Sequence, residues 1–232
     1  MYKLALIVFD LDDTLIAIKR HESRLGNSLK EDVKKIGIAY GVPANILNEV
    51  KNRTALLFNS IIGYLEEEKG YEEDWVKSAR NELNKLLHEH ESLEHETSQL
   101  RDGVIESLEI LKKRGYKLGV LTNTSRSEWN KISSKHKIGK YFGKLTMTRD
   151  DVKRIKPDTE GIQKLLEISN EKKFVVIGDL DYDSLVANKA GGDFILFDTK
   201  RYTQKQIETL DSIAVVSSHR EIPALIESLY SN

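Results

Sequence analysis

Two aspartates follow an apolar run near the start of the chain, in the stretch Phe9-Asp10-Leu11-Asp12-Asp13-Thr14-Leu15. The run before them, residues 4–9, is too short for a typical helix and is rich in strand-favouring residues. It therefore predicts a strand buried on both faces of a parallel sheet. Asp10 and Asp12 would lie at the carboxyl end of that strand, where open α/β sheets place their ligands. Carboxylates this close repel each other, and a Mg²⁺ ion with oxygen ligands would offset the repulsion.

The same stretch has a simpler interpretation, in which Asp12 and Asp13 only form a turn and Asp10 caps a helix. The catalytic interpretation gains weight if later segments bring acidic residues, a lysine and a hydroxyl to the same edge of the sheet. Three later clusters have these residue types. They are Thr122-Asn123 after the expected strand 117–121, Lys156-Pro157 before a helix, and Gly178-Asp179 with Asp183 after the expected strand 174–177.

Each of these clusters is a weak signal when taken alone. A Thr-Asn pair after a strand is usually a helix cap, and a single lysine usually lies on the surface. The spacing of Asp179, Asp181 and Asp183 imitates a calcium-binding loop, but that loop needs Gly at its sixth position and Glu at its twelfth. Ser184 and Ala190 stand at those positions, which excludes the calcium loop.

Strands and helices alternate along the second half of the chain, which predicts right-handed βαβ units and an α/β fold with a parallel sheet. The ends of parallel strands share one edge of the sheet, so residues far apart in sequence can converge there. The expected strands of this half are 117–121, 145–148, 174–177, 194–197 and 213–216, followed by a terminal helix from about 220 to 229.

A long segment between the first two motifs has a different pattern. Apolar residues recur at helical spacing between about 30 and 100, with no convincing strand, and Gly70-Tyr71 marks a joint between helices. We expect a catalytic core of residues 1–16 and 100–232 and an α-helical insert of residues 17–99. Tyr64 and Trp75 are expected in the core of the insert.

Basic residues at the start of the insert, Lys19-Arg20-His21, could meet an anionic substrate, although a solvated linker is the favoured interpretation.

Composition limits the classes of partner. The 232 residues include 36 basic and 37 acidic ones, for a net charge of −1, and no basic block. Nucleic acid and anionic membranes are therefore disfavoured as partners. The absence of cysteine excludes disulfides and thiolate chemistry, and no apolar run is long enough for a membrane span. We expect a cytoplasmic protein that is a monomer or a homodimer.

Taken in order, the four clusters resemble the motifs of the haloacid dehalogenase superfamily. Asp10-Leu11-Asp12-Asp13-Thr14 is similar to the first motif, Leu121-Thr122-Asn123 to the second, Lys156-Pro157 to the third, and Gly178-Asp179 with Asp183 to the fourth. The helical insert is similar to the cap of phosphoglycolate-phosphatase-like members. The resemblance implies a Rossmann-like, doubly wound core and Mg²⁺-dependent phosphoryl transfer through an aspartyl-phosphate on a small phosphorylated metabolite.

The resemblance also implies a role for each motif residue, and the chemistry of the side chains agrees with it. Asp10 would be the nucleophile, and Asp12 the general acid and then the general base. Thr122, the Asn123 backbone N–H and Lys156 would bind the phosphoryl oxygens.

The same resemblance implies a set of Mg²⁺ ligands. They are the Asp10 carboxylate, the Asp12 backbone carbonyl, Asp179, and Asp183 either directly or through water.

The leading hypothesis is thus a phosphatase that hydrolyses a small phosphomonoester. Dehalogenating members of the superfamily lack an acidic residue at the position of Asp12, which favours phosphate chemistry here. A phosphomutase of the same family would use the same nucleophile and return the phosphoryl group to substrate. A non-catalytic phospho-binding or receiver-type signalling protein is a further alternative, which the intact motif residues disfavour.

Overall fold

The computed structural model describes residues 4–18, 26–50, 53–67 and 72–230. The predicted joint Gly70-Tyr71 lies outside these ranges. Lys19, Arg20 and His21 also lie outside the described residues.

The chain divides into two compact units. The first is Met1–Ile18 with Ser98–Asn232, and the second is Lys19–Thr97. The insert thus leaves and re-enters the first unit within two residues of the predicted boundaries. The assignment of the two units as catalytic core and cap stays a prediction.

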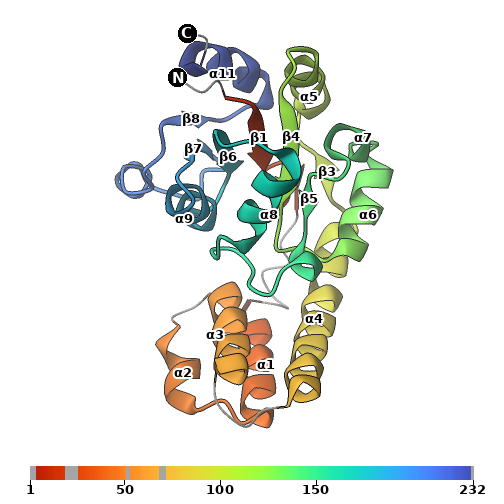
Figure 1. Ribbon diagram of the computed structural model, residues 1–232, viewed down its shortest axis with the longest axis vertical. Coiled ribbons are helices and arrows are strands. Elements are labelled where there is room, and N and C mark those ends of the chain that lie inside the picture. Colours follow the sequence, from red (N-terminus) through yellow and green to blue (C-terminus); the bar gives the residue numbers. More distant parts are fainter. Residues whose placement is uncertain (1–3, 19–25, 51–52, 68–71, 231–232) are drawn as a thin grey trace. The chain divides into compact units, whose positions relative to one another are not determined.

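A parallel sheet forms the centre of the first unit (Figure 1), and within the described residues it has six strands in the order β5-β4-β1-β6-β7-β8. The strands are β1 Leu6–Phe9, β4 Lys117–Leu121, β5 Thr146–Met147, β6 Phe174–Gly178, β7 Asp193–Phe197 and β8 Ala214–Val216. Neighbouring strands pair in parallel throughout. The predicted Rossmann-like, doubly wound parallel fold is confirmed, including the short strand near residue 146.

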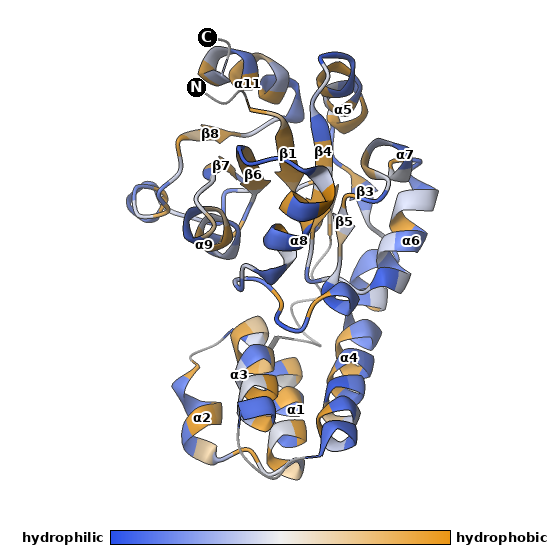
Figure 2. Ribbon diagram, in the orientation of Figure 1, coloured by the Kyte–Doolittle hydropathy of each residue, from blue (hydrophilic) through white to orange (hydrophobic). Residues whose placement is uncertain are grey.

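The first strand lies at the middle of the sheet and is buried on both faces. Ile7 and Phe9 pack into one hydrophobic cluster, whereas Leu6 and Val8 pack into the other. Successive side chains of a strand point to opposite faces, so a strand covered on both sides must be apolar at every position. Figure 2 shows the resulting contrast between the hydrophobic central strands and helices that carry both hydrophobic and hydrophilic residues.

Helices cover both faces of the sheet. One face packs against α5 Val104–Lys113, α6 Arg126–Lys135, α7 Gly139–Phe142 and α11 Ile222–Tyr230. The other packs against α8 Glu160–Ser169 and α9 Asp181–Lys189. The unit also contains α10 Gln204–Ile207 and the 3₁₀ helices η1 Arg149–Asp151 and η2 His219–Glu221.

A small antiparallel pair forms where the chain passes to and from the insert. Strand β2, Ile16–Ala17, pairs with β3, Gln99–Leu100, with Ile16 opposite Leu100. The pair joins the segment after the first motif to the segment before α5, and it was not predicted because two-residue strands have no readable sequence pattern.

The second unit is helical, as predicted. Its helices are α1 Gly26–Ala39, α2 Ala44–Glu49, α3 Thr54–Glu67 and α4 Glu73–His95. Leu57, Ile61 and Leu65 of α3 are buried at helical spacing. The prediction for Trp75 is wrong: its side chain is 45% exposed and packs against the Tyr40 ring at a centroid distance of 4.8 Å. Trp75 lies in the first turn of α4, at the beginning of that helix.

None of the helices in the described ranges combines the length and the apolar character that crossing a bilayer requires.

A buried histidine supports the turn that follows the first motif. His219 is fully buried, and its Nε2 lies 2.8 Å from the Thr14 carbonyl oxygen, so the ring donates this hydrogen bond. Its ring packs against Phe197 at a centroid distance of 4.8 Å. Burial lowers the pKa of His219 to about 4, against the opposing effect of the Thr14 hydrogen bond. The folded protein therefore holds the neutral imidazole at pH 7.

We expect this histidine to make the first unit sensitive to acid. Between pH 6.5 and about 4 the unfolded chain binds a proton at His219 that the folded chain does not, so stability falls as the pH falls. Wild type should lose about 2 kcal/mol more unfolding free energy than His219→Gln between pH 7 and pH 5. Urea unfolding at both pH values measures this difference, and equal losses in the two proteins would contradict it.

Candidate active site

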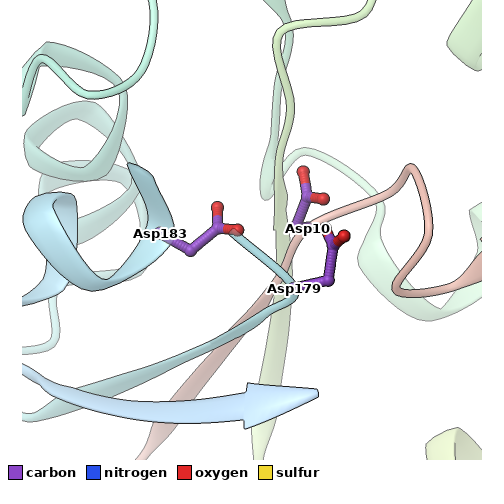
Figure 3. Close-up of side chains that lie close together, drawn as sticks. All are labelled: Asp10, Asp179 and Asp183. Carbon is purple, nitrogen blue, oxygen red and sulfur yellow. The ribbon is translucent and has the colours of Figure 1, made fainter. Parts of the chain in front are cut away.

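Three buried carboxylates converge at the carboxyl end of the sheet. Asp10 follows β1 and remains tied to the sheet, because its N–H donates to the Ile177 carbonyl at 2.9 Å. Asp179 follows β6, and Asp183 lies in the first turn of α9. One carboxylate oxygen of each of the three acids lies within 4.8 Å of those of the others. Figure 3 shows the Asp183 carboxylate pointing toward the other two.

Lys156 places a positive charge inside this cluster. Its Nζ lies 2.5 Å from Asp10 Oδ1 and 2.7 Å from Asp183 Oδ1, and the lysine side chain is only 5% exposed. Lys156 lies 146 positions after Asp10 and 27 positions before Asp183 in the sequence. The structure thus brings together the first, third and fourth motifs.

Burial and the neighbouring charges shift the pKa values of Asp10 and Lys156. Burial raises the pKa of Asp10 well above its ordinary value, and the neighbouring Asp183 and Asp179 act in the same direction, while Lys156 opposes them. Burial alone would lower the pKa of Lys156, but the charges of Asp10 and Asp183 outweigh it and raise that pKa. The Lys156 ammonium is therefore held in its charged form, while burial and the neighbouring carboxylates hold the pKa of Asp10 above its ordinary range.

Gly178 allows the close approach of Asp183 to the end of β6. A β-carbon at position 178 would overlap the Asp183 carboxylate, so any side chain there would displace it. The same carboxylate accepts a hydrogen bond from the Leu180 N–H at 3.1 Å. The absence of a side chain at position 178 and the turn after it therefore aim Asp183 at Lys156.

The second motif is a turn that is held from several sides. The Thr122 N–H donates to the Met147 carbonyl of β5 at 3.0 Å, and the Thr122 hydroxyl oxygen accepts from the Thr124 N–H at 3.1 Å. Asn123 uses its side chain to clamp the third motif: its Oδ1 accepts from the Lys156 N–H at 2.8 Å, and its Nδ2 donates to the Lys156 carbonyl at 3.1 Å.

Asp12 has a hydrogen-bond partner outside the carboxylate cluster. The Thr124 hydroxyl donates to Asp12 Oδ2 at 2.7 Å, and Thr124 itself is buried. Asp12 is partly exposed, whereas Asp10 is buried. The two aspartates of the first motif thus have different surroundings, one buried among carboxylates and one partly exposed beside a hydroxyl.

Two residues that hold the site were missed by the sequence analysis. Thr124 directly follows the second motif, and its contact with Asp12 joins residues 112 positions apart, which no sequence pattern records. Arg149 is buried in η1, where its guanidinium donates to the Asn123 carbonyl at 2.7 Å. A single arginine after a short strand carries no sequence signal for such a role.

The donor set fits a divalent cation. Asp10, Asp179 and Asp183 offer the oxygen ligands that Mg²⁺ prefers, from rigid positions at strand ends and the start of a helix. Three carboxylates outnumber the ammonium of Lys156, so the cluster has room for further positive charge.

The comparisons with known proteins agree with this geometry. The family model of the haloacid dehalogenase-like hydrolases matches residues 7–197, and the chain belongs to this family of hydrolases.

The curated relatives match over about half of their length. The chain is 32% identical over 121 residues to Pyrophosphatase PpaX of Bacillus cereus (strain G9842), a match that covers 51% of this chain and 52% of that protein. The chain thus spans about half of the length of the curated relatives it matches.

Solved structures share the fold. One, from Bacteroides fragilis, is described as a haloacid dehalogenase-like hydrolase and has a TM-score of 0.62 at 18% identity, covering 95% of this chain and 100% of that one. Another, from Thermotoga maritima, is described as a β-phosphoglucomutase and has a TM-score of 0.59 at 22% identity, covering 97% and 100%.

We expect the Asn123 clamp to stabilise the third motif measurably. Asn123→Ala removes both side-chain hydrogen bonds to the Lys156 backbone and should lower the unfolding free energy by about 1–3 kcal/mol. Urea denaturation measures the loss. Asn130→Ala, on the exposed surface of α6, is the matched control and should change stability by less than about 0.5 kcal/mol. Equal effects of the two changes would contradict the clamp.

Proposed function

We propose that this protein is a Mg²⁺-dependent phosphatase that hydrolyses a small phosphomonoester through an aspartyl-phosphate on Asp10, with Asp12 as general acid and base. The observation that supports this best is the buried cluster in which the Lys156 ammonium touches both Asp10 and Asp183. Such an arrangement has little structural value by itself, since burying like charges is costly, and it matches what phosphoryl transfer requires.

In the first step an oxygen of the Asp10 carboxylate attacks phosphorus, and the bond from phosphorus to the leaving oxygen breaks. Asp12 gives its proton to that oxygen, which departs as an alcohol. The hydrogen bond from the Thr124 hydroxyl to Asp12 Oδ2, at 2.7 Å, supports this role because it fixes the direction of the carboxylate. The products of the step are the alcohol and a phosphorylated Asp10.

In the second step water attacks the phosphorylated Asp10, and Asp12, now ionised, takes a proton from that water. Inorganic phosphate leaves, and Asp10 and the protonated Asp12 are regenerated. Lys156 and the Thr122 hydroxyl would bind phosphoryl oxygens through both steps. The Thr122 oxygen already accepts from the Thr124 N–H, which leaves its O–H to donate toward a phosphoryl group.

Asp10, the Asp12 backbone carbonyl and Asp179 would hold the Mg²⁺ ion, with Asp183 acting directly or through water. When bound, the ion would add positive charge that favours the ionised form of Asp10 and neutralises the phosphoryl oxygens.

We also propose a role for the insert, a class of substrate and an oligomeric state. The insert of residues 17–99 would serve as a cap that selects the substrate, and the substrate would be a small phosphorylated metabolite of the cytoplasm. The protein would act as a monomer or a homodimer. Inorganic pyrophosphate belongs among the candidate substrates, because this chain matches about half of the length of relatives that carry the name pyrophosphatase.

A panel of phosphomonoesters and pyrophosphate, assayed with Mg²⁺, tests the nucleophile. Asp10→Asn keeps the size of the side chain but removes the attacking oxygen, and should lower phosphate release at least about a thousandfold. Circular dichroism should show an unchanged fold. Excess chelator should abolish the wild-type activity. Equal activity of the two proteins would remove Asp10 as nucleophile, and release of a second sugar phosphate in place of inorganic phosphate would instead indicate a mutase.

The acid role of Asp12 can be tested through the leaving group. Asp12→Asn should slow the first step with an alkyl phosphate about a hundredfold or more, because the alkoxide then leaves without a proton. With p-nitrophenyl phosphate, whose leaving group needs no proton, a burst of nitrophenol should persist and the phosphorylated enzyme should accumulate. Rapid-quench measurements of both substrates check this, and equal slowing of the first step for both would exclude the acid role.

A further inference from the structure

The aspartate after the acidic pair of the first motif has partners that a turn residue does not need. Asp13 has a φ of 58°, in the left-handed region that Asp tolerates better than most residues, and its side chain is largely buried. The carboxylate lies 3.0 Å from the Arg201 guanidinium and 3.5 Å from the Arg101 guanidinium, and it accepts from the Ile18 N–H at 3.4 Å.

The arginine that meets Asp13 also reaches the fourth motif. The same Nη2 atom of Arg201 lies 3.2 Å from Asp179 Oδ2 and 3.0 Å from Asp13 Oδ2. Arg201 follows β7, its side chain is 30% exposed, and the Asp179 side chain is fully buried. One guanidinium therefore bridges the first motif and the carboxylate at the end of β6, across 188 positions of sequence.

We infer that Arg201 is a positioning residue that sets the orientation of Asp179 for the divalent cation, and that Asp13 holds Arg201 in place. The inference rests on the proposed cation site. A carboxylate ligand needs an outer partner to fix its rotation, and the loss of such partners commonly costs tenfold or more in metal affinity. Arg201 would act through Asp179 and touch neither the substrate nor the ion.

The charge of Asp13 decides whether this arrangement helps or harms cation binding. A lone guanidinium beside Asp179 would repel the ion and weaken its binding. Asp13 supplies a negative charge beside the positive charge of Arg201, so the pair orients Asp179 with less repulsion of the ion than Arg201 would exert alone. Arg101 further fixes Asp13, and its guanidinium packs over the Phe197 ring at 5.2 Å.

Calorimetric titration with Mg²⁺ separates these contributions. Arg201→Gln should raise the dissociation constant about tenfold, because Asp179 loses its outer partner. Arg201→Lys should recover part of this loss, since an ammonium can still reach a carboxylate. Asp13→Asn should also weaken binding, because it leaves the Arg201 charge uncompensated. The double variant Asp13→Asn/Arg201→Gln should match Arg201→Gln within about twofold, because Asp13 acts through Arg201.

Activity gives a second readout. The Mg²⁺ concentration for half-maximal activity should rise in Arg201→Gln in step with the dissociation constant, and the loss of activity should shrink as Mg²⁺ approaches saturation. A merely structural role would give a loss that Mg²⁺ does not relieve. Arg114→Gln is the matched control: it removes one arginine charge at the end of α5, where Arg114 donates to the Pro223 carbonyl and pairs with Glu227.

The outcomes distinguish the inference from the proposed function. Normal Mg²⁺ binding by wild type with an unchanged or lower dissociation constant in Arg201→Gln overturns the inference alone. A wild type that binds no Mg²⁺ overturns the cation site and the inference with it. If Arg201→Gln does not fold, the comparison of wild type with Arg201→Lys and Asp13→Asn decides the question, because equal affinities in all three would also overturn it.

Discussion

The rest of the site depends on one interaction, the contact of the buried Lys156 ammonium with the carboxylates of Asp10 and Asp183. Removing three carboxylates and an ammonium from water costs more than packing alone returns, and leaving any of them without an opposite charge would cost several kcal/mol more. The surroundings therefore serve to hold this group in one geometry. Asn123 clamps the Lys156 backbone, and the bare Gly178 lets Asp183 approach.

The doubly wound sheet is what allows such a costly cluster to persist. Its central strand is apolar on both faces, and β1 is flanked by β4 and β6, so the segments that follow these three strands emerge side by side at one edge. The three carboxylates come from the ends of β1 and β6 and from the first turn of α9, and Lys156 comes from the turn before α8. Preorganised charge of this kind is more effective in phosphoryl transfer than charge on mobile loops, because it does not have to be rearranged during the reaction.

An outer layer of contacts gives the two aspartates of the first motif different surroundings. Asp10 belongs to the buried cluster, while Asp12 is turned to Thr124 at a partly exposed position. Arg149 fixes the turn that carries Thr124 through the Asn123 carbonyl. Arg201 contacts both Asp13 and Asp179, which joins the first motif to the fourth. Thr124 and Arg201 each contact a first-motif aspartate that lies more than 100 positions away in the sequence.

The sequence by itself determined the strands, the helical character of the insert and the residues of the four motifs, because burial on both faces and chemical type leave a local pattern. The strand predicted at 174–177 is observed at Phe174–Gly178 for this reason. Only the tertiary structure decided the β2–β3 pair, the exposed position of Trp75 and the contacts of Thr124, Arg149 and Arg201. Such contacts join positions 20 to 190 residues apart, and a single chain carries no periodicity that records which distant side chain fills the space beside a carboxylate.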